Sequence, residues 1–202
     1  MSDQVKASDV KALRDKTGAG MMDSKEALKE ANGDIERAVE ILRVKGQASA
    51  AKRSDRGTSE GVVASYIHNN RNVGSLVEVL CETDFVARND DFVEFASEVA
   101  IHVAATSPEY VSSDEIPEKK VAQERKVFEE KAAEEGKPAD VVEKIVDGQL
   151  SKWKSEVTLL DQEHVNADKH DSRTIEQMRE DLAAKVGENV VVARIACFRI
   201  GD

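Results

Sequence analysis

Residues 62–92, VVASYIHNNRNVGSLVEVLCETDFVARNDDF, decide the fold of this chain. Two runs of β-branched and other apolar residues flank the polar tetrapeptide NNRN at 69–72, which is the composition of a β-hairpin. Directly after the second run stand Thr83 and Asp84, whose residue types cap helices. The stretch therefore predicts two antiparallel strands followed at once by the start of a helix.

The pentapeptide ETDFV within this stretch permits two interpretations. In the first, Thr83 or Asp84 caps a helical turn while Phe85 and Val86 pack in the core. In the second, the turn presents an acid and an aromatic side chain to a partner, because rigid aromatic residues make good interface anchors. Composition alone favours the core interpretation.

Downstream of this motif the pattern alternates between helices and a final strand. Apolar residues recur at helical spacing over 90–105, and two further helical stretches, 117–136 and 138–155, each open with a proline that suits the first turn of a helix. Ser172 is expected to cap a last helix, and the run NVVVARIACFRI that follows predicts a terminal strand. The expected fold class is α+β, a small antiparallel sheet packed with helices.

Upstream, the first 46 residues predict three short helices. Asp34 is expected to cap the third helix and Gly46 to end it. Residues 47–60 are small, polar and locally basic, as in a linker or a solvated helix. We therefore expect a three-helix docking domain at 1–46, a linker at 47–60, and an α+β core and dimerisation domain at 61–202. The apolar terminal strand would leave an exposed edge that invites pairing with a second copy.

Three residues near the first turn are candidates for contact with another protein. Met21 and Met22 adjoin the glycine-rich turn TGAG and precede Asp23, the expected cap of the second helix. A methionine pair here is usually core, yet thioethers beside a glycine turn also suit a binding surface, and we expect one to be buried and one exposed. Arg14 lies off the apolar stripe of the first helix, where it is either solvated or paired with an acidic partner.

Composition narrows the classes of partner and compartment. The net charge of −11 repels polyanions, so we expect a protein partner and neither direct nucleic-acid binding nor an anionic membrane. Cys81 and Cys197 are too few for a disulfide framework, which fits a reducing, cytoplasmic setting. The first residues lack the apolar run of a signal peptide, and no window is long and apolar enough to span a membrane.

The sequence contains no recognisable catalytic motif. It has neither G-x-S-x-G nor a glycine-rich phosphate loop, and its four histidines lack the spacing of metal ligands. Cys81 falls in an apolar strand, where a thiol is normally inert. We therefore expect no catalytic residue, no metal site and no cofactor. Two rival functions stay open: a non-catalytic adaptor built on the helical bundle, and an enzyme that uses Cys81 or a carboxylate pair.

Two long motifs carry a resemblance to a known family. They are LRDKTGAGMMDSKEALKEANGDIERAVEILR at 13–43 and EVLCETDFVARNDDF at 78–92. Both are similar, in this order, to the two signatures of bacterial translation elongation factor Ts, and the likeness continues over nearly the whole chain. Two departures stand out. Leu80 occupies a position where the family usually has Asn, and the chain has one core subdomain with no inserted coiled coil, as in the short form of the family.

This resemblance implies a guanine-nucleotide exchange factor rather than an enzyme. Its expected partner is elongation factor Tu in the GDP-bound form, from which it promotes GDP release. The N-terminal helices would form a ubiquitin-associated-like bundle that docks on the partner's nucleotide domain. Arg14, Met21 and Met22 match the family's contact positions in this bundle.

The resemblance also gives a role to the ETDFV segment and to one histidine. Four residues match the motif that family members push toward the partner's magnesium site, where the aromatic ring would act as a wedge: Thr83, Asp84, Phe85 and Val86. His102 matches a supporting contact. The short form of the family further implies a homodimer that uses the surface of the missing half.

Overall fold

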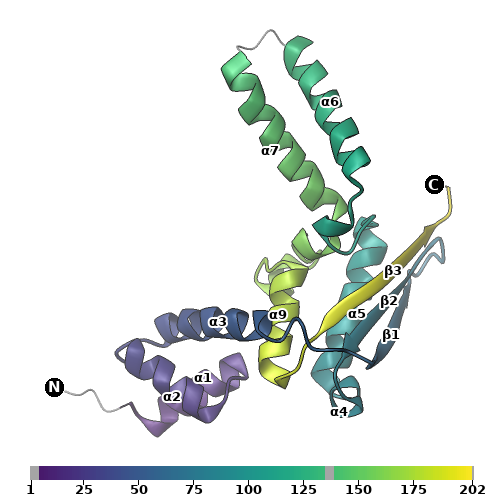
Figure 1. Ribbon diagram of the computed structural model, residues 1–202. Coiled ribbons are helices and arrows are strands. Elements are labelled where there is room, and N and C mark those ends of the chain that lie inside the picture. The colour runs from purple at the N-terminus through teal and green to yellow at the C-terminus, as the bar shows by residue number, and fades with distance from the viewer. Residues whose placement is uncertain (1–4, 135–138, 202) are drawn as a thin grey trace. The chain divides into compact units, whose positions relative to one another are not determined.

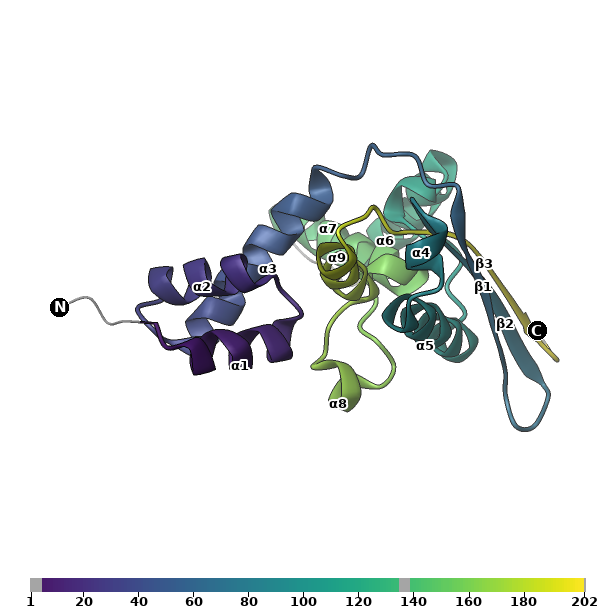
Figure 2. The same ribbon diagram turned by 90° about the horizontal axis from the view of Figure 1, so that it is seen from below.

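The computed structural model describes residues 5–134 and 139–201, and it confirms the predicted α+β architecture (Figures 1 and 2). Pro138, expected to open a helix, lies outside the described residues. The strands are β1 Glu60–Ile67, β2 Val73–Cys81 and β3 Val191–Arg199. The helices are α1 Ala7–Thr17, α2 Met21–Glu30, α3 Ile35–Ala51, α4 Asp84–Ala87, α5 Asp90–Thr106, α6 Glu118–Glu134, α7 Ala139–Val157, α8 Ala167–His170 and α9 Ile175–Val186, with short 3-10 turns at Ser113–Glu115 and Leu159–Asp161.

The first three helices pack around a small apolar core. Asp34 caps α3 as predicted, since its carboxylate accepts a hydrogen bond from the Arg37 amide at 3.0 Å. α2 instead begins at Met21, two residues before Asp23. Its N-cap residue is Gly20, which has no side chain to make a capping hydrogen bond. The buried side chains of this core are Val10, Leu13, Ala27, Leu28, Ala31, Ala38 and Leu42.

α3 continues past Gly46, so the prediction that this glycine ends the helix is wrong. A Cβ atom placed on Gly46 would lie 3.2 Å from the Cβ atom of Ala184 on α9. The missing side chain therefore lets α3 and α9 approach closely, which is a packing role rather than a helix stop. The first residues of the expected linker, up to Ala51, are helical as a result.

The three strands form an antiparallel sheet in the order β1-β2-β3 (Figure 1). The His68 amide donates to the Val73 carbonyl at 2.9 Å and closes the predicted hairpin. The Ile200 amide donates to the Asn72 carbonyl at 2.9 Å, which sets the register between β2 and β3. In the same register, the Arg194 guanidinium on β3 lies opposite the Glu78 carboxylate on β2, 2.6 Å away.

The two faces of the sheet differ in what covers them. Ser75, Val77 and Val79 alternate along the buried face, where the Ser75 hydroxyl donates to the Ala100 carbonyl of α5 at 2.6 Å. By alternation the opposite face, called here the outer face, carries the intervening residues. It exposes the large apolar side chains of Val63, Ile67, Leu76 and Phe198, and Ile200, directly after β3, continues them.

The chain forms two compact units, each assembled from several segments. The first unit holds residues up to 62, 80–95 and 177–191, and the second holds the described residues of 63–79, 96–176 and 192 onward. All three strands and the helices α5 and α9 run from one unit into the other. The expected domains divide the chain differently, strictly along the sequence, and as independent domains they stay a prediction: 1–46, 47–60 and 61–202.

α6 and α7 lie side by side in the second unit (Figure 1). An ion pair of 2.6 Å between Arg125 and Asp147 links them. Both side chains are partly exposed, so the pair adds at most about 1 kcal/mol. No helix in the described part of the chain combines the length and apolar character needed to cross a membrane.

Candidate protein-binding site on α4

A single helical turn, α4, follows directly on β2. Thr83 is its N-cap residue, and the Thr83 hydroxyl oxygen accepts a long hydrogen bond of 3.5 Å from the Val86 amide. Ala87 turns inward and is buried, whereas Phe85 is 83% exposed. The predicted cap is therefore confirmed for Thr83, and the interpretation of Phe85 as a core residue is wrong.

Phe85 is the most exposed large apolar side chain in the described part of the chain. One exposed apolar side chain is common on folded proteins and does not by itself mark a site. This one stands on a backbone that is fixed on both sides, by the cap at Thr83 and by buried Ala87. A fixed backbone presents the ring to another protein with little loss of conformational entropy on binding.

The acid of the motif, Asp84, is held only loosely. Its carboxylate lies 3.1 Å from the Arg88 guanidinium, in a pair whose side chains are 46% and 81% exposed respectively. Such exposed pairs contribute about 0–1 kcal/mol, so exchanging one partner for another costs little. Asp84 is thus free to turn toward a cation or a hydrogen-bond donor on a second protein.

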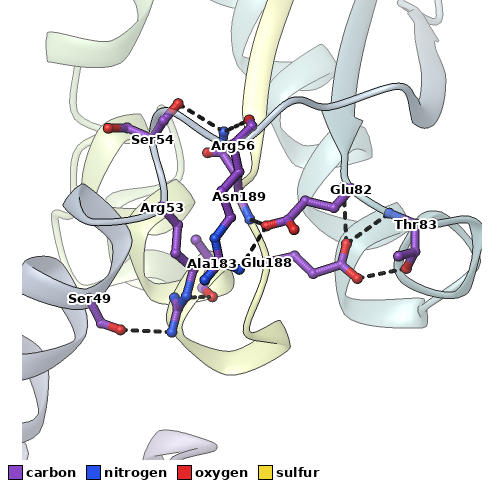
Figure 3. Close-up of polar contacts among 9 residues, drawn as sticks. All are labelled: Ser49, Arg53, Ser54, Arg56, Glu82, Thr83, Ala183, Glu188 and Asn189. Carbon is purple, nitrogen blue, oxygen red and sulfur yellow. Dashed lines mark hydrogen bonds and ion pairs between the residues drawn. The ribbon is translucent and has the colours of Figure 1, made fainter.

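The segment that carries the motif is tied to the end of α9 by one carboxylate, that of Glu188 (Figure 3). One carboxylate oxygen accepts hydrogen bonds from the backbone amides of Glu82 and Thr83, both at 3.0 Å. The other accepts the Thr83 hydroxyl proton at 2.6 Å. Bonds of this kind, with an ionised acceptor, are about twice as strong as neutral ones.

Glu82 and Asn189 add a further hydrogen bond between the same two segments (Figure 3). The Glu82 carboxylate accepts a hydrogen bond of 2.7 Å from the amide of Asn189, which is itself buried. The Asn189 side-chain amide then donates to the carbonyls of Ser54 and Arg56, at 3.2 and 2.9 Å. These hydrogen bonds therefore join three segments that are distant in sequence and lie next to the motif.

The predicted docking residues all lie at the surface of the first unit. Arg14 is exposed on α1, off the apolar stripe as expected. Met21 and Met22 are 50% and 65% exposed, so the expectation that one of them is buried is wrong. The reason is that the buried face of α2 begins only at Ser24, one turn further along the helix.

Lys185 connects the docking turn with the helix that follows the motif. Its aliphatic stem passes over Gly18, where an added Cβ atom would lie 3.1 Å from the stem carbons. Its ammonium group reaches the Asp91 carboxylate at the start of α5, 2.7 Å away. Gly18 also has a φ of 70°, a conformation that side-chain-bearing residues rarely adopt.

His102 is not at the surface. The ring is completely buried in the second unit, and its Nδ1 atom accepts a hydrogen bond of 3.0 Å from the Val165 amide. Because an amide can only donate, the ring proton lies on Nε2, which donates to the Gln162 side-chain oxygen at 2.8 Å. Burial lowers the pKa of His102 to about 4, so the ring is neutral at neutral pH.

Among the described residues, Glu98, His164 and His170 place ligand atoms within 4.8 Å of one another. The Asn166 amide donates to His164 Nδ1 at 3.1 Å, so the ring proton of His164 lies on Nε2, which faces the Glu98 carbonyl at 3.2 Å. The Lys169 ammonium, 2.6 Å from the Glu98 carboxylate, already neutralises that charge. A protonated ring nitrogen does not bind a metal, so this arrangement is an internal polar network.

The environment of Cys81 does not favour a role as a catalytic nucleophile. Its side chain is fully buried, and the thiol donates to the Thr83 carbonyl at 3.2 Å. Burial is the main reason that the Cys81 pKa rises to about 11. A nucleophilic cysteine needs a thiolate at working pH, which this environment opposes. The prediction that Cys81 is a core residue is confirmed.

The residues that hold the motif in place had no counterpart in the sequence-based expectations. Glu188 and Asn189 follow Gly187, which ends α9 with a φ of 77°. That glycine signals the end of a helix and nothing more. Glu188 is 105 residues from Thr83, and no local pattern connects positions so far apart.

An exposed acid and aromatic on a fixed turn, without an activated nucleophile among the described residues, is typical of a protein that acts by binding another protein. Comparison with known families agrees with this class. Residues 2–171 match the family model described as elongation factor TS. The chain belongs to the elongation factor Ts family, and its general role is that of a translation elongation factor.

Curated relatives support the same assignment over almost the full length. Elongation factor Ts of Solidesulfovibrio magneticus is 50% identical over 198 residues, which cover 98% of each chain. The Thermosipho melanesiensis protein of the same name is 45% identical, over 98% of this chain and all of the relative. Elongation factor Ts of Carboxydothermus hydrogenoformans is 48% identical, over 96% of this chain and 88% of its own length.

Proposed function

We propose that this chain is a guanine-nucleotide exchange factor that binds elongation factor Tu in its GDP-bound form, disturbs the partner's magnesium site and promotes GDP release. The observation that carries the proposal is the placement of Asp84 and Phe85 on an exposed turn. Hydrogen bonds to Glu188 hold the backbone directly before this turn. Membership of the elongation factor Ts family supports it.

The mechanism follows from the properties of the bound metal. Mg²⁺ requires near-ideal octahedral oxygen geometry and bridges nucleotide phosphates, so a small shift of its surroundings weakens nucleotide binding. Phe85 supplies that shift as a wedge between partner side chains, with Asp84 beside it and Thr83 and Val86 forming the rest of the contact. Because coupling between binding sites is reciprocal, the factor binds the empty partner more tightly than the GDP-bound one, and incoming nucleotide expels it.

The N-terminal helices provide docking in this proposal, as a ubiquitin-associated-like bundle. Met21 and Met22 offer exposed, adaptable thioethers, which suit contact with an apolar surface. Arg14 on the neighbouring helix offers a guanidinium to an acidic side chain. Docking holds the partner while α4 acts on the metal site, and no covalent step is required of this chain.

His102 can support the contact only through its neighbours, because the ring is buried and both of its nitrogen atoms are bonded internally. Its Nδ1 atom holds the amide of Val165, whose side chain is 51% exposed. We therefore propose that His102 stabilises the loop that presents Val165.

The test is the release of a labelled nucleotide. Adding this chain to elongation factor Tu loaded with fluorescent GDP, in the presence of excess unlabelled GDP, is expected to accelerate release about 5- to 150-fold. Coupling energies of about 1–3 kcal/mol change affinity by this factor, and affinity changes appear mostly in the dissociation rate. Stopped-flow fluorescence measures the rate. An unchanged release rate would exclude the proposed function.

The same assay separates the rival functions. An adaptor would bind elongation factor Tu, or some other protein, without altering the release rate. An enzyme would turn over a substrate on its own, which the buried Cys81 does not favour. A net charge of −11 argues against direct nucleic-acid or membrane binding, and we place the exchange activity in the cytoplasm.

We further propose that the chain is a homodimer that pairs through the outer face and the β3 edge of its sheet. β3 is an edge strand, and Phe198 and Ile200 at its end are 72% and 75% exposed. Leu76 on the adjacent strand β2 and Ile67 on β1 add two more exposed apolar side chains. A second copy would bury all four side chains and cover the unpaired edge.

Phe198→Asp is expected to convert this dimer into a monomer, because a carboxylate buried in an apolar contact weakens association by about a hundredfold or more. Sedimentation equilibrium at micromolar concentration measures the mass. Val127→Asp on α6 introduces the same charge at a 42% exposed valine and serves as the matched control. A wild-type chain that sediments as a monomer would remove the dimer proposal, and a dimeric Phe198→Asp variant would remove the outer face from it.

A further inference from the structure

The Glu188 carboxylate accepts three hydrogen bonds from one short segment. It collects the two backbone amides at the junction of β2 and α4, those of Glu82 and Thr83, and also the Thr83 hydroxyl proton. All three donors belong to the segment that immediately precedes Asp84 and Phe85. The carboxylate thus holds the backbone directly before the two motif residues that are expected to contact the partner.

The direction of these bonds determines how the cap works. Because the Thr83 hydroxyl donates its proton to Glu188, the lone pairs of the same oxygen are left to accept from the Val86 amide. A chain of hydrogen bonds therefore runs from Glu188 through Thr83 into the turn that carries Phe85. Without the carboxylate, the hydroxyl is free to rotate and the cap, already long at 3.5 Å, is lost more easily.

A second contact makes this arrangement reciprocal (Figure 3). The Glu82 carboxylate accepts the Asn189 amide proton, so each of the two segments offers a carboxylate to the backbone of the other. The Asn189 side chain anchors the pair to the carbonyls of Ser54 and Arg56. The end of α9 is consequently a fixed base, to which the much smaller α4 is attached.

We propose that Glu188 is a positioning residue for nucleotide exchange, which holds α4 so that Phe85 and Asp84 meet the partner in one orientation. The inference rests on the exchange function proposed above. A motif held in one orientation directs the ring at the same point on the partner each time, so a larger share of the bound complexes is productive. Glu188 acts through Thr83 and touches neither nucleotide nor metal.

The test separates positioning from docking. Glu188→Ala is expected to lower the GDP-release rate at saturating factor about tenfold, the effect of losing hydrogen bonds to a charged group, while the half-saturating concentration changes little. That concentration depends mainly on the separate docking residues Met21 and Met22. Glu188→Gln is expected to recover part of the rate, because an amide oxygen still accepts both backbone amides, whereas its NH₂ group reverses the direction of the bond to Thr83.

A matched control and a second readout complete the design. Glu180→Ala removes a carboxylate from α9 that makes no polar contact with other described residues, and it is expected to behave as wild type. Residue-level hydrogen exchange of the Glu82 and Thr83 amides reports the same bonds without elongation factor Tu, and we expect their protection to fall in Glu188→Ala and to return in Glu188→Gln. Amide protection at Leu28 in the bundle monitors the rest of the fold.

The outcomes are distinct. An active wild type with an equally active Glu188→Ala variant would overturn the inference, as would a change confined to the half-saturating concentration. A wild type that fails to release GDP would reject the proposed function, and hydrogen exchange alone would then decide whether Glu188 holds α4. Unchanged protection of the Glu82 and Thr83 amides in Glu188→Ala would overturn the inference, whatever the release rates are.

Discussion

Replacing Phe85 with alanine is expected to slow accelerated GDP release about 30-fold at equal factor concentration, while the fold stays intact. Truncation of an aromatic interface anchor costs about 2 kcal/mol or more, and each 1.4 kcal/mol is a factor of ten. The ring is 83% exposed and carries almost no packing within the chain. Substitutions at such positions change the free energy of unfolding by about 0.5 kcal/mol or less. Stopped-flow release of fluorescent GDP and urea unfolding measure the two quantities.

The comparison needs a variant that removes an exposed apolar side chain elsewhere. Val127→Ala on α6 does this at a 42% exposed position and is expected to match wild type in both assays. Two results would contradict the wedge. Release by Phe85→Ala at the wild-type rate would show that the ring is not used, and a large loss of stability in that variant would show that the ring is structural.

The sequence predicts those elements of the fold whose signals are local. The hairpin and the final strand follow from runs of β-branched residues around turn residues, and α5 follows from apolar residues at helical spacing. The cap at Asp34 is also local, because its carboxylate bonds an amide three residues away. Each of these signals lies within a few residues of the feature that it predicts.

Features that depend on distant residues could not be predicted in this way. Gly46 has the signature of a helix end, but its role is set by Ala184, and the helix continues. Met21 has the character of a core residue, but burial on α2 begins only at Ser24. Glu188 gives no signal at all, since one surface carboxylate in an acidic sequence resembles every other.

The ETDFV motif shows both what a sequence can predict and what it cannot. Composition favoured a buried Phe85, and only the likeness of the whole segment to a known signature indicated an exposed one. The structure confirms that the ring is exposed and adds the reason that its backbone stays in place, the bonds from Glu188. Sequence similarity therefore indicated which residues to expect at a contact with a partner, and the structure shows which hydrogen bonds hold their backbone.

Lowering the pH from 8 to 5 is expected to reduce the free energy of unfolding by about 2 kcal/mol through His102 alone. In the folded protein, burial lowers the pKa of this ring to about 4, with His164 acting in the same direction and the Gln162 hydrogen bond opposing it. In the unfolded chain the pKa is near its ordinary value of 6.5. Between these two values the unfolded state binds more protons, so stability is present above pH 6.5 and is lost as the pH falls toward 4.

His102→Gln removes the titrating group, and urea unfolding at pH 8 and pH 5 measures the difference. The variant is expected to be less stable than wild type at pH 8, because the Val165 amide loses its buried acceptor, yet to lose about 2 kcal/mol less than wild type between the two pH values. His68→Gln is the matched control, since that ring is exposed on the hairpin. Burial also lowers the pKa of His164, so part of the acid sensitivity persists in His102→Gln. Equal pH dependence in wild type and His102→Gln would mean that burial does not lower the pKa of this ring.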